Sequence, residues 1–396
     1  MGSQATANLK GSTRLGNYLR KLRSGYGYSL RRVEERARAE GGEIDNSQLS
    51  RYEKGICYPS FDKLRVLASV FNVSIQSFSD MVDLEAFEEL KPESSDPREL
   101  TEFGNQAMKD GNHGAAFACY ERAIELLLDK RGDLEARVLL SQVRVTQAAA
   151  LTRLGKLSLA EQELRVALRG NSRLDETTQV RALLSLANIH ADLGDTMLSE
   201  IEAEKAARLA GEANLARLEA MAKHTLARVL ADQKQFSKAV DRYREAAHLY
   251  TGCGESFEAM KVRVGIGTCY VDLGKTREGV RMLRAALSEA KTAGHRRLQA
   301  FAWSSLGQAY YRQDDVDRAR GCFRESDTLA LYNNEKQPDV LFLNAYYEWK
   351  IATKADNPTR ERISFGRLKG LRSELERKFP EVEAFDSYME GGCRHA

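Results

Sequence analysis

A short run of polar side chains near the start of the chain has the types and spacing needed to hydrogen bond the edges of nucleotide bases. Asn46, Ser47 and Gln48 follow one another at the beginning of a short predicted helix. An amide side chain can bond adenine through two hydrogen bonds, and a hydroxyl can bond any base. Arg51 and Lys54 lie one turn further along, where basic groups suit contacts with phosphate or guanine. The run therefore predicts a surface that binds double-stranded DNA.

Several predicted helices position this run. They are expected over residues 15–23, 30–38, 47–54 and 61–71, with a last short helix that reaches Phe78. Ser29 can cap the second helix, and Asp45 or Asn46 can cap the third. Leu49 and Tyr52 fall on the face of the third helix opposite the polar run, so we expect them to point into a small core.

The order of these helices resembles the helix-turn-helix of the Cro and phage-repressor group known as the XRE family. The matching residues are Ser29-Leu30 and Val33, the run from Asn46 to Gly55, Pro59-Ser60, Leu64, Leu67-Ala68, Phe71 and Val73-Ser74. In such a motif the recognition helix enters the major groove with its N-terminal residues at the base edges. The resemblance implies DNA contacts from Asn46, Ser47, Gln48, Arg51, Lys54 and Ser29. The turn over residues 38–44 is longer than the family's usual tight turn. The alternative is a solvated polar helix in an ordinary helical bundle.

From residue 98 onward the chain repeats itself with a period near 40. A small residue marks the middle of the first helix of each unit, and the markers are Gly104, Ala148, Ala187, Ala227, Gly267 and Gly307. Their spacings are 44, 39, 40, 40 and 40 residues. The second helix of most units has a small residue, then a large or apolar one four positions later, as in Ala116/Tyr120, Gly279/Leu283 and Ala319/Phe323. Small residues at these points let the two helices of a unit approach closely.

This pattern resembles the tetratricopeptide repeat, whose usual period is about 34 residues. The longer period predicts helices longer by about a turn, or longer loops. Six units are expected, followed by a degenerate capping unit over residues 345–375 and a terminal helix over residues 379–389. The predicted fold class is all-α: a helix-turn-helix domain followed by a right-handed α-solenoid of about 40-residue tetratricopeptide-like repeats.

An XRE-type head joined to such an array resembles the peptide-pheromone receptors of the RRNPP group. The resemblance implies a homodimer, a palindromic operator, and a short peptide held in the concave groove of the array. Asparagines on the first helices of the units often clamp the peptide in that group. The candidates for peptide binding here are Asn105, Asn188, Arg228, Gln308 and Asn344. Arg228 could hold a carboxylate, whereas Ala149 and Thr268 depart from the clamp type. The alternative for each candidate is a solvated polar position.

Charge is distributed unevenly along the chain. Residues 14–65 hold 12 basic and 7 acidic residues, whereas residues 80–102 hold 2 basic and 9 acidic residues. We therefore divide the chain into a helix-turn-helix domain over residues 12–80, an acidic connector over residues 81–97 and a repeat domain for ligand sensing and dimerisation over residues 98–390. The prolines and serines near the end of the connector predict a hinge-like linker.

Composition and motifs also limit the possible functions. The sequence has no apolar run long enough to cross a membrane and no N-terminal targeting signal, and its six cysteines lack metal-ligand spacing, so we expect a cytoplasmic protein. No nucleophile elbow or phosphate loop appears, so we expect no enzymatic activity, no metal and no cofactor. The main prediction is a transcription regulator controlled by a peptide. The alternatives are a DNA-binding regulator whose array docks a protein partner, or one that senses a small molecule.

Overall fold

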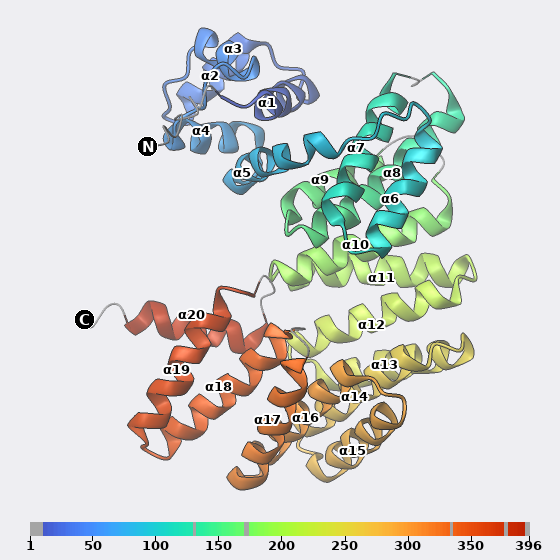
Figure 1. The fold of residues 1–396 in the computed structure, drawn as a ribbon, viewed down its shortest axis with the longest axis vertical. Helices are drawn as coiled ribbons and strands as arrows, with labels where there is room; N and C mark the ends of the chain where they lie inside the picture. Colours follow the sequence, from blue (N-terminus) through green and yellow to red (C-terminus); the bar gives the residue numbers. More distant parts are fainter. Residues whose placement is uncertain (1–10, 130–131, 170–173, 333–335, 376–378, 393–396) are drawn as a thin grey trace, which may run out of the picture. The chain divides into compact units, whose positions relative to one another are not determined.

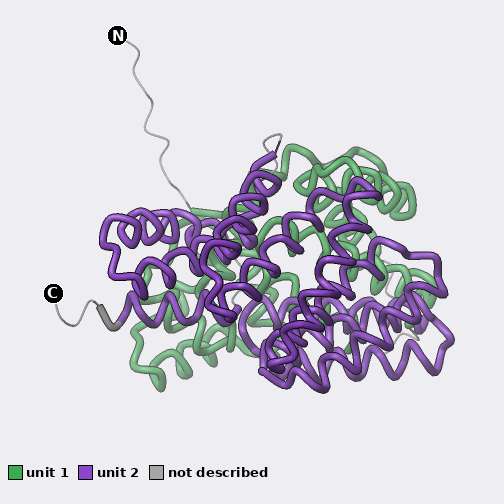
Figure 2. Tube along the Cα trace, turned by 90° about the horizontal axis from the view of Figure 1, so that it is seen from below, with its two compact units in different colours: residues 1–174 green, residues 175–396 purple. Residues whose placement is uncertain are grey.

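Helices account for every regular element in the residues that the structure describes (Figure 1). The structure, a computed structural model, describes residues 11–129, 132–169, 174–332, 336–375 and 379–392. This confirms the all-α prediction. None of the described helices is both long and apolar enough to cross a lipid bilayer. The chain divides into two compact units, residues 1–174 and 175–396 (Figure 2).

Five helices form the N-terminal head of the first unit. They are α1 (Thr13–Gly25), α2 (Leu30–Ala39), α3 (Asn46–Glu53), α4 (Phe61–Phe71) and α5 (Ile75–Asp83). Each lies within a few residues of its predicted range. The apolar side chains that the sequence pattern pointed inward are buried, among them Leu19, Val33, Leu49 and Phe71. Burial of these side chains on one face of each helix stabilises the head.

Local hydrogen bonds fix where these helices begin. The hydroxyl of Ser29 accepts from the backbone N–H of Arg32, and the carboxylate of Asp45 accepts from that of Gln48. Both bonds satisfy backbone donors that a helix leaves unpaired at its first turn. Asp45 is therefore the cap of the third helix, which settles the choice between Asp45 and Asn46.

The long turn between α2 and α3 is anchored at two points. Ile44 is 2% exposed and inserts into the core of the head. At Gly42, an added Cβ would lie 2.5 Å from a methyl group of Val66 on α4, so only glycine fits without a shift of that side chain. These contacts fix a turn that is longer than the family's usual one.

The acidic segment after the head contains a short 3-10 helix, η1 (Leu84–Leu90). Leu84 is 1% exposed, so η1 is packed rather than free. Residues 91–96 have no regular structure, and Asp96 caps the next helix through the backbone N–H of Arg98. Ion pairs that are described below hold η1 and Lys91, whereas the hinge-like linker expected from the prolines and serines over residues 92–97 stays a prediction.

Consecutive helices continue from residue 97 as stacked pairs. In the first unit these are α6 (Pro97–Lys109), α7 (His113–Leu128), α8 (Leu134–Arg153) and α9 (Leu157–Arg169). In the second unit they are α10 (Glu176–Asp192), α11 (Thr196–Glu212), α12 (Ala216–Asp232), α13 (Phe236–Gly252), α14 (Ser256–Asp272), α15 (Thr276–Thr292), α16 (Arg296–Arg312), α17 (Val316–Ala330), α18 (Pro338–Lys354), α19 (Pro358–Arg372) and α20 (Pro380–Gly392). The predicted capping unit corresponds to α18 and α19, and the predicted terminal helix corresponds to α20.

The helix lengths in the second unit explain the 40-residue period. The helices α10 to α16 each have 17 residues. A three-residue turn follows each of them, with a left-handed residue at its centre. These left-handed positions are Gly194, Asn214, Lys234, Gly254, Gly274, Gly294 and Asp314. Two helices and two such turns give 40 residues, so longer helices rather than longer loops lengthen the repeat.

The marker residues lie where paired helices approach most closely. A Cβ added at Gly104 would lie 2.4 Å from the ring of Tyr120, and one at Gly307 would lie 2.4 Å from the ring of Phe323. Both rings belong to the large residues that the sequence pattern identified on the second helix of the unit. The repeat pattern therefore reports real contacts between the two helices of a pair.

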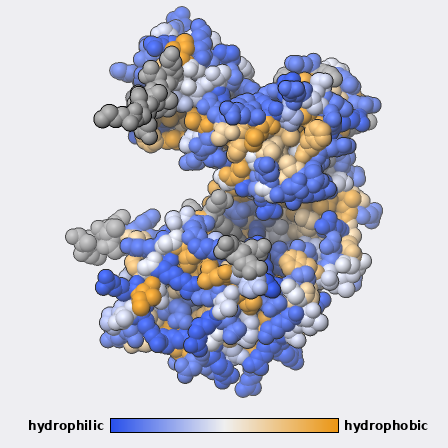
Figure 3. Space-filling model, in the orientation of Figure 1, coloured by the Kyte–Doolittle hydropathy of each residue, from blue (hydrophilic) through white to orange (hydrophobic). Residues whose placement is uncertain are grey.

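The face of the molecule seen in Figure 3 is mostly hydrophilic. Hydrophobic residues gather on this face over α7, α8 and α9, whereas the surface of the head is dominated by hydrophilic residues. A hydrophilic surface agrees with the 30% of charged residues in the sequence.

Candidate functional site

The start of α3 presents the polar run that the sequence analysis selected. Asn46 and Ser47 are exposed, and Gln48 is partly exposed. On the opposite side, Leu49 and Tyr52 are buried, at 1% and 7% exposure. The first turn of α3 thus has its polar face toward solvent and its apolar face in the core, as predicted.

Asp45 organises this first turn. One of its carboxylate oxygens accepts from the Ser47 hydroxyl at 2.6 Å and from the backbone N–H of Gln48 at 2.7 Å. The hydrogen bond from Ser47 is the main cause that lowers the pKa of Asp45, so the carboxylate stays ionised. The hydroxyl of Ser47 is therefore held by its own turn.

Gln48 has a partner on α4. The ammonium of Lys63 donates a hydrogen bond to Gln48 Oε1 at 2.7 Å. Both residues line an open hollow of about 880 Å³ between the long α2–α3 turn and α4. The hollow has charged side chains of both signs on its walls, including Glu43 and Arg65. Sequence reasoning missed Lys63, because the two residues lie 15 positions apart on different helices.

The remaining predicted DNA-contacting residues are also at the surface. Arg51, Lys54 and Ser29 are exposed. Ser29 is committed to capping α2 by accepting from the N–H of Arg32 at 3.1 Å. Arg51 is in the last turn of α3 and Lys54 is its C-cap, so both basic groups lie at the opposite end of this short helix from Asn46. Exposed basic side chains of this kind suit phosphate contacts.

A buried carboxylate holds the far end of α3 against α1. Glu53 is 5% exposed, and its two oxygens accept from Arg23 at 2.6 and 2.9 Å. These bonds are the main cause that raises the pKa of Arg23. The two helices also approach closely at Gly16, where an added Cβ would lie 2.6 Å from the backbone oxygen of Tyr52. The bidentate pair of Arg23 and Glu53 fixes the recognition helix within the head.

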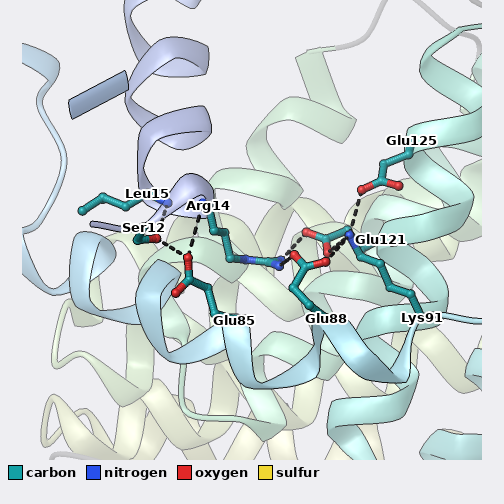
Figure 4. A network of polar contacts seen from close by, with 8 residues as sticks. All are labelled: Ser12, Arg14, Leu15, Glu85, Glu88, Lys91, Glu121 and Glu125. Atoms are coloured by element: carbon teal, nitrogen blue, oxygen red, sulfur yellow. Dashed lines mark hydrogen bonds and ion pairs between the residues drawn. The ribbon is translucent and has the colours of Figure 1, made fainter. Parts of the chain in front are cut away.

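A network of ion pairs joins the head to the connector and to α7 (Figure 4). Arg14 on α1 is 7% exposed and forms ion pairs with Glu88 of η1 and Glu121 of α7. The Ser12 hydroxyl, next to α1, donates to Glu85 of η1. One buried cation thus connects three elements that are distant in sequence.

Lys91 extends this network from the connector. Its ammonium lies 2.8 Å from Glu88, 3.0 Å from Glu121 and 2.9 Å from Glu125 (Figure 4). Burial alone would lower the pKa of Lys91, but the three carboxylates outweigh burial and raise it. Glu88 of the connector therefore has two basic partners, Arg14 and Lys91, which the uneven charge distribution alone did not reveal.

A second group of contacts joins the head to α9. Lys156, the residue directly before α9, lies 3.1 Å from Asp80 and 2.5 Å from Asp83. The hydroxyl of Tyr18 donates to Gln162 at 2.9 Å, and burial raises the pKa of Tyr18 to about 12. The head is therefore held at two places on the first two repeat pairs.

Two of the predicted ligand-binding residues contact each other. Arg228 on α12 donates to Asn188 Oδ1 on α10 at 2.9 Å. The two residues lie 40 positions apart, at the same place in successive first helices, and both are partly exposed. They form a polar pair across two repeat units.

Two other candidates have different surroundings. Asn105 is exposed and accepts from the hydroxyl of Tyr120 at 2.8 Å. Gln308 is 8% exposed, with its amide 3.5 Å from the hydroxyl of Ser304. Each of these contacts lies within a single repeat unit, so neither residue belongs to the pair that joins α10 and α12.

Asn344 has a packing role in this structure. It is fully buried, and its amide donates to Ser326 at 2.9 Å and to Asp327 at 2.8 Å, both on α17. A fully buried amide that faces the neighbouring helix has no surface to offer a ligand. The sequence pattern suggested a groove position because it gives the helix position but not the neighbour that a side chain meets.

Sequence reasoning also missed a polar chain in the last repeats. Arg312 of α16 forms an ion pair with Asp272 of α14, and it also hydrogen bonds Tyr347 of α18. The hydroxyl of Tyr347 donates to Glu381 of α20 at 2.8 Å. Burial raises the pKa of Glu381. The chain links α20 to three first helices, and its first two members, Asp272 and Arg312, lie 40 residues apart.

Comparisons with known proteins agree with this architecture. Residues 19–78 match the family model described as helix-turn-helix. No curated protein sequence matches the chain at a significant level.

Solved structures match the fold of the repeat array. NprR in complex with its cognate peptide NprX is 14% identical, with a TM-score of 0.54 over 75% of this chain and 88% of that one. A tetratricopeptide repeat protein from Parabacteroides merdae is 16% identical, with a TM-score of 0.52 over 69% of this chain and 93% of that one. The apo form of RapI is 16% identical, with a TM-score of 0.51 over 59% of this chain and 84% of that one. These matches confirm the predicted fold of the repeat array, a tetratricopeptide-like solenoid, and the family model confirms a helix-turn-helix in the head.

Proposed function

We propose that the protein is a cytoplasmic, non-enzymatic transcription regulator that binds a specific operator and is controlled by a short peptide in the groove of its repeat array. The observation that carries the DNA-binding part is the exposed, capped start of α3 within a helix-turn-helix. Asn46, Ser47 and Gln48 are at the positions from which such helices contact base edges. Arg51 and Lys54 supply charge for the phosphates.

The peptide part of the proposal rests on the array. Stacked repeat units contact mainly their neighbours, so a ligand that bridges several units can change the curvature of the array. Asn188 and Arg228 are such a bridging pair, since they lie on successive first helices and hydrogen bond each other. An amide and a guanidinium suit the backbone and the carboxylate of a peptide. NprR was solved with a bound peptide, which supports the same kind of ligand here.

The head must respond when the array changes. The ion pairs of Arg14 and Lys156 hold the head on α7 and α9, so a movement of these helices would move α3 as well. With a free linker alone between them, the repeat helices could move without moving the head. The contacts thus provide a mechanical route from the array to the DNA-binding helix, provided that the ligand binds the two shapes of the array with different affinity.

A selection from random DNA duplexes tests the proposal. The full-length protein should enrich an inverted repeat whose half-sites lie about 34–36 Å apart, or a multiple of that distance, because a dimer places two recognition helices in successive major grooves. Enrichment should be lost with Asn46→Ala/Gln48→Ala, while Gln106→Ala on α6 serves as a control outside the head. A wild-type protein that enriches no sequence would contradict the proposed function.

A further inference from the structure

We propose that Lys63 determines which base Gln48 selects. It does so by holding the amide oxygen of Gln48, so that Gln48 offers only N–H donors to DNA and selects guanine over adenine. This inference rests on the proposed DNA-binding function and adds a positioning residue on α4 to the residues of the recognition helix.

The chemistry of lysine fixes the orientation of the Gln48 amide. A lysine ammonium has three donors and no acceptor, so the amide atom that faces it must be the oxygen. The distance from Lys63 Nζ to Gln48 Oε1 is 2.7 Å, a normal hydrogen bond to a charged donor. The amide nitrogen must therefore point away from Lys63.

The surroundings keep Lys63 in this position. Lys63 is the third residue of α4, and its side chain is partly buried beside the hollow that it shares with Gln48. The carboxylate of Asp45 lies close enough for Lys63 to contribute to its lowered pKa. The Asp45 carboxylate thus also attracts the ammonium that bonds the amide oxygen of Gln48.

This orientation favours one purine over the other. A glutamine that binds adenine with two bonds must accept from the N6 amino group with its oxygen and donate to N7 with its nitrogen. The ammonium uses one lone pair of the Gln48 oxygen and sets a positive charge beside it, which disfavours a second donor there, so the amide nitrogen remains for DNA. Guanine presents two acceptors, O6 and N7, to such donors. Adenine would place its N6 donor group against them, which leaves polar groups unpaired and disfavours adenine.

The test is the same selection from random duplexes, made with the full-length wild type and four variants. Gln48→Ala identifies the base position that Gln48 contacts, because the preference there disappears. Lys63→Met removes the donor, and Lys63→Arg keeps a donor-only cation. Arg65→Met removes one positive charge from an exposed position of the same helix and controls for lost charge.

We expect wild type, Lys63→Arg and Arg65→Met to prefer guanine at that position by roughly tenfold or more. We expect Lys63→Met to lose this preference or to change it to adenine, while the preferences at other positions stay. A guanine preference that survives Lys63→Met, or a wild-type preference for adenine, would overturn the inference. Failure of the wild type to enrich any sequence would instead overturn the proposed function on which the inference rests.

Discussion

At the scale of single residues, the exposed face of α3 carries the sequence-reading part of the proposal. Asp45 uses its carboxylate to hold Ser47 and the first turn of the helix. Within the polar run, Gln48 has an amide nitrogen that is not bonded to Lys63. We therefore expect Gln48 to contribute more to specificity than Ser47.

Replacement of Gln48 by alanine tests this expectation. The variant should weaken specific operator binding by about 1–3 kcal/mol, because a base-edge hydrogen bond is lost. Non-specific binding should change little, since it depends on phosphate contacts. Band-shift titrations on the selected operator and on unrelated DNA at fixed salt would measure both. Equal weakening on the two duplexes would contradict base recognition by Gln48, and Gln106→Ala is the matched control.

A largely buried histidine on α12 gives the second residue-scale prediction. Burial is the main cause that lowers the pKa of His224 to about 3, and the positive charges of Lys261 and Arg228 lower it further. The carboxylate of Glu258, 4.0 Å from the ring, does not offset these causes. The pKa of His224 is 6.5 in the unfolded chain and about 3 in the folded protein, so between these values only the unfolded chain takes up the proton. The stability that the neutral ring contributes is therefore fully present above pH 6.5. It is lost as the pH falls from 6.5 toward 3.

Unfolding by denaturant at pH 7 and pH 5 measures this effect. The contribution of His224 to the loss should be about 2 kcal/mol at pH 5, from about 1.36 kcal/mol per pKa unit. His224→Gln should reduce the loss by that amount, whereas His248→Gln, at an exposed position of the adjacent helix α13, should not. The same pH dependence in the wild type and His224→Gln would show that the ring does not titrate as described.

At the scale of elements, ion pairs hold the head, η1 and the first repeat pair together. Arg14 is buried between two carboxylates from η1 and α7, and its guanidinium lies over the ring of Phe117, 5.2 Å from the centroid. Removal of either member of a buried pair leaves the other without its partner, which is costly. The free energy of unfolding should therefore show strong coupling between the two members.

A double-mutant cycle of Arg14→Ala and Glu121→Ala measures this coupling. We expect an interaction energy of about 0.5–3 kcal/mol from the unfolding free energies of the four proteins. The exposed pair Arg32 and Glu35 on α2 is the control, with at most about 0.5 kcal/mol. Additive effects of Arg14→Ala and Glu121→Ala would mean that the network does not hold the head.

Elements were the part of the molecule that the sequence predicted best. Local signals such as Ser29 and the glycine markers determine caps and close helix contacts, and these act over a few residues or one repeat. The contacts of Lys63 with Gln48, and of Arg14 with Glu121, join residues that lie 15 and 107 positions apart. The sequence periodicity does not predict such pairs, because they depend on how the helices pack against one another.

At the scale of the whole molecule, DNA recognition by one short helix calls for two copies. A single α3 contacts few bases, whereas two linked heads multiply affinity. We propose that the repeat array supplies most of the contact between the copies, because the head is small. Multi-angle light scattering at micromolar concentration should give twice the mass of 44.4 kDa. A monomer with and without the selected operator would contradict this expectation.

The central claim is that a ligand on the array changes operator binding, and the double variant Asn188→Ala/Arg228→Ala tests it most directly. The probes are synthetic C-terminal fragments of any small secreted peptide encoded beside the gene. Band shifts on the selected operator, with and without each fragment, should show a change in affinity for the wild type. The double variant should keep the basal affinity and the fold but lose the response. A double variant that responds as the wild type does would contradict the claim and would favour a partner that docks elsewhere on the array.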